Sequence, residues 1–393
     1  MKKDYRPEEM RETAEAIRTA VMPKSITPDM VGGTMLGILN ALGEVVEVLG
    51  EIPREHVTVK VRGYDGESEV SAAGAIVCVD MFSIGGYPTI AIPRQEFTAN
   101  EDGVVEFDVP YGYKYALFSK IAGLGVSFQL VYDALAETRK INLWNFPIGV
   151  WALGHTDLAN YDIDIYKAVP FITDGYMEEI PEEIALWAQD EEHPNHEGWW
   201  YVGILVSTAD TTFAIAQNNL SEKTMQWCDS HDRTTLFPLL NYFAERRYDQ
   251  PWDWDASVEQ ARTDFDGNMN TAKILAFSPT HIAARSAVSQ PADYDEQRFL
   301  PSAGQLYIMT LNREAINKLA QEFNNDGWEF ALLPYPNEKG QWQYPNENEG
   351  DWWSSSVLDK TCSWVVNYYG GLNRYDRNYL DSVRAVSAFH FEY

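Results

Sequence analysis

Alternating apolar and polar residues, broken by turn-forming residues, constrain the fold most strongly between residues 54 and 140. Val57, Val59 and Val61 occupy every second position, which is the period of a β-strand with one buried face. Asp102-Gly103 then supplies a turn before another alternating stretch. Because short strands recur about every 8–12 residues here, the pattern predicts an antiparallel β-sandwich over residues 54–140.

This sandwich pattern resembles the small Ig-like and transthyretin-like modules that act as spacers in surface and phage proteins. The resemblance implies a fold for residues 54–140 and indicates almost nothing about function. Function is therefore sought in the segments on either side.

Residues 1–53 have helical periodicity. Thr27 is expected to cap a helix whose first position is Pro28. Apolar residues then follow at alternating spacings of 4 and 3, namely Val31, Met35, Ile38, Leu42, Val45 and Leu49. Three of them are β-branched at d positions, which favours three or more strands, so the seam predicts a homotrimeric coiled coil. The alternative is a helix packed on its own domain, because four glycines weaken a free-standing coil.

Charge and length limit the classes of partner. The 393 residues include 30 basic and 59 acidic side chains, a formal net charge of −29, which argues against a nucleic-acid partner. No apolar run approaches the length of a membrane span, so no membrane insertion is expected. The first residues are charged where a signal peptide needs an apolar segment, and the three cysteines form no disulfide framework. We expect synthesis in a reducing cytoplasm.

The third segment, residues 141–393, combines regular and irregular stretches. Trp199–Gln217 predicts a pair of strands, and Asn312–Asp326 predicts a helix. Much of the remainder is rich in Trp and long in loops. Loops of this length on a compact scaffold are typical of binding sites.

Three motifs in this segment contain potential metal ligands. His193 and His196 lie among glutamates, Asp264–Asn268 looks like the start of a calcium loop, and Tyr-Pro-Asn-Glu occurs at 335–338 and 344–347. The first two lack the further ligands that a zinc or calcium site needs. We interpret them as an acidic loop and a turn, and the repeats as proline-anchored turns, with a cation at the repeats as the alternative. No metal and no cofactor are expected.

The sequence contains no recognisable motif for nucleophilic catalysis. The serines at 354–356 lack a G-x-S-x-G elbow, Cys362 has no neighbouring histidine, and no glycine-rich phosphate loop occurs. We therefore expect a binding protein and not an enzyme.

The C-terminal residues have an unusual composition. Between Val357 and Val383, only Lys360 and Trp364 belong to the set Lys, Glu, Gln, Met and Trp. The preceding 25 residues, 327–351, contain nine of that set. The segment is instead rich in Tyr, Asn, Asp, Ser, Arg and Gly.

Four segments carry a resemblance to a known family: Leu300–Leu306, Trp353–Ser355, Trp364–Val366 and Val383–Val386. In this order they resemble the frame of the C-terminal C-type-lectin-like domain of variable proteins diversified by retroelements. The fold is shared with formylglycine-generating enzymes. The resemblance implies a lectin-like unit over residues 141–393 with a variable region at about 352–389.

The resemblance also implies a cause for the composition. Such retroelements randomise adenines, typically in Asn codons whose last base remains a pyrimidine. Those codons cannot become Lys, Glu, Gln, Met or Trp, which is the missing set, so Lys360 and Trp364 are expected to be fixed. Chance composition of a Tyr- and Asn-rich loop is the alternative.

Variable side chains of this type are expected to form a ligand face, with Tyr and Arg for contact area and Asn, Ser and Gly for adaptable hydrogen bonds. On the strand that begins at Ser363, alternation places Trp364 and Val366 inward and Ser363, Val365 and Asn367 outward. The predicted ligand-binding residues are Val357, Leu358, Asp359, Ser363, Val365, Asn367, Tyr368, Tyr369, Leu372, Asn373, Arg374, Tyr375, Asp376, Asn378, Tyr379 and Asp381.

The fold expected overall is α+β, with an N-terminal helical oligomerisation segment, a β-sandwich and the lectin-like domain. The function expected is that of a phage tail receptor-binding protein, located at the virion tail tip. It would attach to tail proteins through its N-terminus and bind a bacterial surface receptor, protein or glycan. A cell-encoded variable surface adhesin is the alternative. A formylglycine-generating-type enzyme is a weaker one, because Cys228 and Cys362 form no closely spaced reactive pair.

Overall fold

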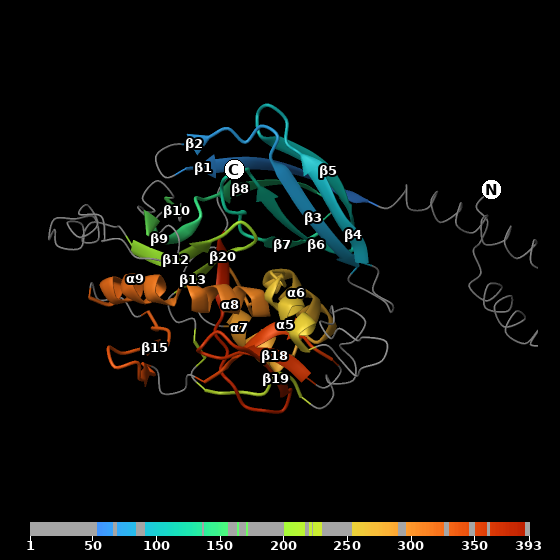
Figure 1. Ribbon diagram of the computed structural model, residues 1–393. Coiled ribbons are helices and arrows are strands. Elements are labelled where there is room, and N and C mark those ends of the chain that lie inside the picture. The colour runs from blue at the N-terminus through green and yellow to red at the C-terminus, as the bar shows by residue number, and fades with distance from the viewer. Residues whose placement is uncertain are drawn as a thin grey trace, which may run out of the picture. The chain divides into compact units, whose positions relative to one another are not determined.

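The computed structural model describes residues 53–65, 69–83, 91–135, 137–155, 163–164, 170–171, 200–216, 220–221, 223–229, 254–289, 296–325, 330–345, 350–359 and 362–389. Residues 54–393 form one compact unit. The predicted coiled coil between Val31 and Leu49 and the motif with His193 and His196 lie outside the described residues. Within the described part, the architecture is mixed α+β, with several antiparallel sheets and five helices (Figure 1).

β1 (Arg54–Tyr64) is the centre of the first sheet of a β-sandwich. Its burial alternates, and the three valines that predicted the strand are all buried. β2 (Glu69–Val70) and β5 (Val104–Pro110) pair with β1 antiparallel, whereas β8 (Thr138–Asn145) pairs with it in parallel. The predicted strands are confirmed, but the parallel pair departs from an all-antiparallel sandwich. The domain boundary expected after residue 140 falls inside β8.

The second sheet packs face to face on the first. Its order is β4–β3–β6–β7, and the strand bounds are Ile76–Ser83 for β3, Ala91–Thr98 for β4, Tyr113–Lys120 for β6 and Leu130–Asp133 for β7. Phe107 of β5 contacts two rings of the second sheet. Its ring centroid lies 5.0 Å from that of Phe97 and 6.4 Å from that of Tyr115. One apolar core therefore joins the two sheets.

A seven-stranded sheet forms the centre of the C-terminal part. Its order is β10–β9–β12–β13–β20–β14, with β11 paired to β9. The bounds are Gly149–His155 for β9, Ile163–Asp164 for β10, Pro170–Phe171 for β11, Trp200–Ser207 for β12, Thr212–Ala216 for β13, Glu296–Phe299 for β14 and Val386–Phe389 for β20. The strand pair predicted over Trp199–Gln217 is confirmed as β12 and β13.

Five helices lie in the described residues: α5 (Trp254–Arg262), α6 (Gly267–Phe277), α7 (Ile282–Ser289), α8 (Ala303–Leu311) and α9 (Arg313–Asn325). α9 confirms the helix predicted over Asn312–Asp326. α8 begins with a capping box, in which Ser302 and Gln305 each satisfy a backbone N–H of the other. Each of these five helices is too short or too polar to cross a bilayer.

Two small sheets complete the structure. β17 (Trp352–Val357), β18 (Cys362–Val366) and β19 (Leu372–Asp376) form a three-stranded antiparallel sheet. β15 (Tyr335–Pro336) and β16 (Trp342–Gln343) form a short hairpin. Figure 1 shows β18 and β19 at the opposite end of the compact unit from the sandwich strands β3 to β5.

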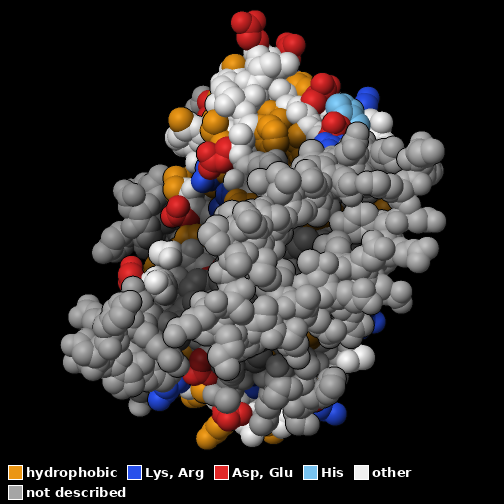
Figure 2. All heavy atoms as spheres, turned by 90° about the vertical axis from the view of Figure 1, so that its right-hand side faces the viewer, with side chains coloured by type: hydrophobic (Ala, Val, Ile, Leu, Met, Phe, Trp, Pro, Cys, Tyr) orange, Lys and Arg blue, Asp and Glu red, His pale blue; other side chains and the backbone are white. Residues whose placement is uncertain are grey.

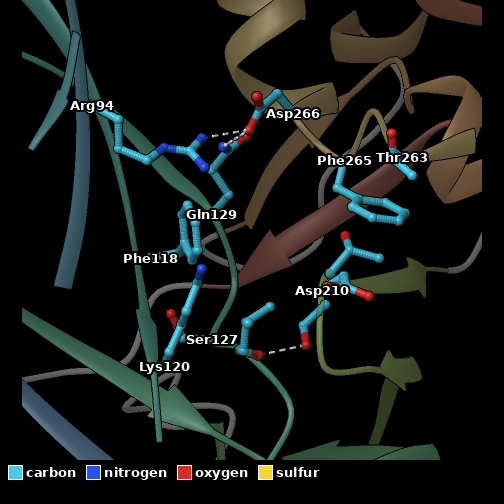
Figure 3. A pocket seen from close by; sticks show the side chains of 12 residues that line it. Arg94, Phe118, Lys120, Ser127, Gln129, Asp210, Thr263, Phe265 and Asp266 are labelled. Carbon is cyan, nitrogen blue, oxygen red and sulfur yellow. Dashed lines mark hydrogen bonds and ion pairs between the residues drawn. The ribbon is translucent and has the colours of Figure 1, made fainter. Parts of the chain in front are cut away.

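Hydrogen bonds join the sandwich to the C-terminal part. The Gln129 amide donates to Asp266 at 2.9 Å and accepts from the backbone N–H of Met269 at 3.1 Å. Arg94 of β4 is held by Asp80 and reaches Asp266 at 3.2 Å (Figure 3). A cavity of about 160 Å³ lies beside these contacts, between Phe118 and Lys120 of the sandwich and Asp210, Phe265 and Asp266 of the C-terminal part. These polar contacts fix the orientation of the two parts.

The exposed surface of the sandwich is mixed in character. Figure 2 shows acidic, basic and apolar side chains interspersed on the described part of the face turned to the viewer. On the sandwich, His56 is hydrogen-bonded to Asp108 at 3.0 Å, and Arg62 forms an ion pair with Glu69 at 3.4 Å. Exposed pairs of this kind contribute little to stability.

Candidate functional site

The four segments expected to form the frame meet in the C-terminal core. Leu300, Trp353 and Val383 belong to one buried apolar cluster. The backbone N–H of Ser355 donates to the carbonyl oxygen of Pro301 at 2.8 Å, and the Ser354 hydroxyl donates to that of Trp364 at 2.7 Å. Hydrogen bonds thus join the segment at Pro301 to Ser355 and the segment at Ser354 to Trp364.

Strand β18 is buried on both of its faces. Trp364 and Val366 join the large core on one face, as predicted, while Val365 joins the smaller core with Trp353 on the other. The prediction that Ser363 and Val365 face solvent is wrong, since both side chains are fully buried. The reason is that β18 is the central strand of its sheet and the α6–α7 region covers the second face. Four further predicted ligand residues are also buried: Val357, Leu358, Leu372 and Asp381.

Three predicted ligand residues build turns. The Asn367 side chain accepts from the backbone N–H groups of Tyr369 and Gly371, at 3.0 and 2.8 Å. Asp359 accepts from the N–H of Cys362 at 3.0 Å, and Asp376 accepts from that of Asn378 at 3.2 Å. Such local bonds from Asn and Asp fix loop conformation. These residues hold the loops that present their neighbours.

The first exposed group on this face is the Trp342 patch, defined as Trp342, Tyr344, Tyr368 and Tyr369. The ring centroids of Trp342 and Tyr369 are 4.6 Å apart, and those of Tyr344 and Tyr368 are 5.1 Å apart. The Arg313 guanidinium lies over the Trp342 ring at 4.8 Å and donates to the carbonyl oxygen of Tyr368. The patch therefore combines the β15–β16 hairpin with the loop after β18.

The second exposed group surrounds a pocket. Trp254, Asn373, Arg374 and Tyr375 line this Trp254 pocket, whose volume is about 450 Å³. The Arg374 guanidinium lies 5.9 Å from the Trp254 ring centroid. Asn373, Arg374 and Tyr375 are predicted ligand residues, and the structure brings them together on β19.

The third group is the Tyr375 patch, defined as Tyr375, Tyr379, Asp351 and Asp381. The two tyrosine rings have centroids 5.5 Å apart, and Tyr379 is 59% exposed. The Tyr375 hydroxyl donates to Asp351 at 2.9 Å. Burial raises the pKa of Tyr375 to about 12, assisted by the hydrogen bond to Asp351 and the charge of that carboxylate. Tyr375 therefore remains a neutral donor at physiological pH.

The two carboxylates of the Tyr375 patch are electrostatically unusual. Burial raises the pKa of Asp381 to about 7, and the neighbouring charge of Asp351 adds to the effect. Burial also raises the pKa of Asp351, although the hydrogen bond from Tyr375 opposes the shift. Both groups are short of compensating positive charge.

The structure adds residues that the sequence pattern did not identify, because they precede residue 352. Trp254, Arg313, Trp342, Tyr344 and Asp351 all contribute to the exposed groups. The signal in the sequence was the pair of Tyr-Pro-Asn-Glu repeats: Trp342 lies between them, and Tyr344 is the first residue of the second. The first two residues of the first repeat form β15. Among the described residues, no group of three or more His, Cys, Asp or Glu could hold a metal ion.

Comparison with known proteins gives no family assignment: no protein-family model and no curated protein matches the chain. A fimbrial protein from Bacteroides ovatus is similar at 10% identity with a TM-score of 0.31, covering 86% of this chain and 71% of that one. GBS52, the minor pilin of Streptococcus agalactiae, is similar at 13% identity with a TM-score of 0.20, covering 25% of this chain and 46% of that one. The shaft pilin SpaA from Lactobacillus rhamnosus GG is similar at 13% identity with a TM-score of 0.17, covering 28% and 58%. The chain thus spans less than half of the streptococcal pilin, and the likeness is distant.

Proposed function

We propose that this chain is a surface attachment protein that binds a receptor through the face formed by the Trp342 patch, the Trp254 pocket and the Tyr375 patch. The observation that supports this most is the contrast between frame and face. Exposed Trp, Tyr and Arg side chains are presented by hydrogen-bonded turns on a fully buried frame. Clustered exposed aromatics mark interaction sites, and these residue types are enriched in binding hot spots.

Binding, as opposed to catalysis, fits the chemistry of the face. Cys228 is fully buried in the smaller core, and no described cysteine forms a disulfide. A formylglycine-generating-type reaction needs a reactive cysteine pair, which a buried thiol does not supply.

A finer part of the proposal is that the face is diversified by a retroelement. Four predicted ligand residues are exposed: Tyr369, Arg374, Asn378 and Tyr379. They lie in residues 357–383, where Lys360 and Trp364 are the only members of the set Lys, Glu, Gln, Met and Trp. A near-copy of the DNA for residues 352–389 beside a reverse-transcriptase gene would support this. A gene neighbourhood with neither feature would contradict it.

We propose two candidates for the structure that carries this binding face. A phage tail is the first candidate, with the N-terminal residues attached to tail proteins as a homotrimer. A cell-encoded adhesin is the second, because an attachment protein displayed on a cell uses the same kind of face. Tail genes beside the gene would favour the first, and an anchor or secretion gene would favour the second.

Cell binding tests the attachment function directly. The full chain, labelled with a fluorophore, is titrated onto bacteria isolated from the source of the sequence, and bound label is read by flow cytometry. The proposal expects saturable binding to particular strains that the unlabelled chain competes away. Label that rises without saturation on every strain would contradict it.

A further inference from the structure

Asp381 is a recessed carboxylate within the proposed binding face. Its backbone is fixed, because its N–H donates to the carbonyl oxygen of Met225 at 3.0 Å and its own carbonyl accepts from the Met225 N–H at 2.8 Å. The side chain is only 8% exposed. Its Oδ2 atom is buried and has no hydrogen-bond partner among the described residues.

Among the described residues, the groups that bear on Asp381 supply no positive charge. Asp351 comes from the chain just before β17, Tyr375 from β19 and Tyr379 from the turn that follows. Asp351 already accepts the Tyr375 hydroxyl at 2.9 Å. Among the described residues, burial and the Asp351 charge account for the raised pKa of Asp381, and no cation opposes them.

A buried carboxyl oxygen without a partner is costly, and proteins normally satisfy such groups with a hydrogen bond or an opposite charge. The patch reaches the surface through Asp351 and Tyr375, which are half-buried, and through Tyr379, which is exposed. The Tyr375 hydroxyl contacts Asp351 at 2.9 Å, and the Tyr379 ring centroid lies 5.5 Å from that of Tyr375. Aromatic rings accept both an aliphatic stem and a cation.

We propose that the Tyr375 patch receives a basic side chain of a protein receptor, whose ammonium or guanidinium group is bound by Asp381 and Asp351. This inference rests on the proposed attachment function and specifies the chemistry of its ligand. The Trp254 pocket shares Tyr375 with the patch and has a volume of about 450 Å³, enough for a further side chain. Two adjacent subsites, one with the carboxylates Asp351 and Asp381 and one lined by Trp254, Asn373, Arg374 and Tyr375, match neighbouring side chains of a polypeptide.

Binding of a cation is coupled to loss of a proton from Asp381. With a pKa of about 7, the carboxyl is mostly protonated at pH 5.5 and mostly ionised at pH 8. If only the ionised form binds the cation, the affinity increases by about 30-fold between these two values. A purely apolar contact with the tyrosine rings has no such dependence.

Saturation-transfer NMR on the full chain tests the site with three small probes. Nα-acetyl-lysine methylamide and Nα-acetyl-arginine methylamide carry the cation, and Nα-acetyl-norleucine methylamide has the lysine stem without the charge. We expect saturation transfer to the cationic probes at pH 8, a large loss at pH 5.5, and a weak pH-independent signal for the norleucine probe. Comparing lysine with arginine identifies the preferred cation.

Two substitutions locate the effect. Asp381→Asn should abolish the cationic signal, whereas Asp210→Asn, at an exposed carboxylate in the turn after β12, should leave it unchanged. Asp351→Asn is the second variant, to be used if Asp381→Asn does not fold, and it should weaken the signal. Circular dichroism verifies the fold of each.

The outcomes separate this inference from the proposed function. If the chain binds cells but the lysine probe gives no more signal than norleucine, the cation site is wrong and attachment stands. If the lysine signal is present and lost in Asp381→Asn while no cells are bound, the cation site stands and attachment is wrong. An equal lysine signal in wild type and Asp381→Asn overturns the inference.

Discussion

Asp264 couples the stability of the C-terminal part to pH, and its replacement by Asn measures the coupling. The side chain is buried beneath the face, where it accepts hydrogen bonds from Ser356 at 2.5 Å and from the Asn270 amide at 3.1 Å. Burial, with the charge of Asp266 adding to it, raises its pKa to about 6 from the ordinary 3.8. The hydrogen bonds oppose this shift without cancelling it.

The sign of the effect follows from the raised pKa. Below pH 3.8 the carboxyl is protonated in both the folded and the unfolded chain, so the stability associated with the raised pKa is fully present. That contribution is lost as the pH rises through about 6, because the folded state then holds a buried charge. A difference between pKa values of 3.8 and about 6 corresponds to about 3 kcal/mol.

Urea unfolding of wild type and Asp264→Asn between pH 4 and 7.5 is the assay. The Asn side chain introduced at position 264 does not titrate. Any stability that the variant loses through altered hydrogen bonds is therefore the same at every pH, and it adds only a constant offset to the difference between wild type and variant. The free energy of unfolding of wild type relative to the variant should fall by about 2 kcal/mol between pH 4 and 7.5, because part of the full contribution is already lost at pH 4. A constant difference across this range would show that Asp264 has an ordinary pKa, and a difference that increases with pH would reverse the reasoning.

Three further predictions concern the frame, one turn and the N-terminal segment. Trp364→Ala should lower the free energy of unfolding by about 3–5 kcal/mol in urea titrations, because the side chain is fully buried, and a cost under about 1 kcal/mol would place it outside the core. Gly370→Ala should cost more than Gly112→Ala: both glycines have φ +86°, but a Cβ at Gly370 lies 2.7 Å from the Thr310 hydroxyl whereas that at Gly112 meets open space. Equal thermal midpoints for these two variants would refute the steric argument. Light scattering should give a mass about three times 44.7 kDa if the predicted seam assembles, and a monomer would refute the coiled coil.

Local periodicity was sufficient to predict much of the secondary structure. Val57, Val59 and Val61 predicted β1, and the apolar spacing after Asn312 predicted α9. The parallel pairing of β1 with β8 could not be predicted, because the two strands lie far apart in the chain and no local pattern encodes their pairing. The hydrogen bonds that join the two parts could not be predicted from the sequence either: the Gln129 amide donates to Asp266, and the Gln297 side chain both accepts from the Val131 N–H and donates to the Val131 carbonyl oxygen.

The candidate site was predictable only in part, for a related reason. Alternation correctly placed Trp364 and Val366 in the core, but it assumed that one face of β18 meets solvent. Trp227 and Ala284, which cover the other face beside Val365, are distant in sequence. Single-strand periodicity cannot show that a second layer covers a strand.

The central claim is that a rigid frame carries an independent binding face, and one set of variants tests it most directly. Tyr368, Tyr375 and Tyr379 are replaced together by Ala, with Tyr111→Ala as the matched control, since Tyr111 is 57% exposed on the sandwich and lies outside the proposed face. Cell binding and the thermal midpoint are measured on the same preparations. The account predicts at least a 100-fold loss of binding for the triple variant, on the basis of about 2 kcal/mol per hot-spot residue, with a midpoint close to that of wild type and an unaffected Tyr111 variant. Unfolding of the triple variant would show that these tyrosines belong to the core, and undiminished binding would show that the receptor is bound elsewhere.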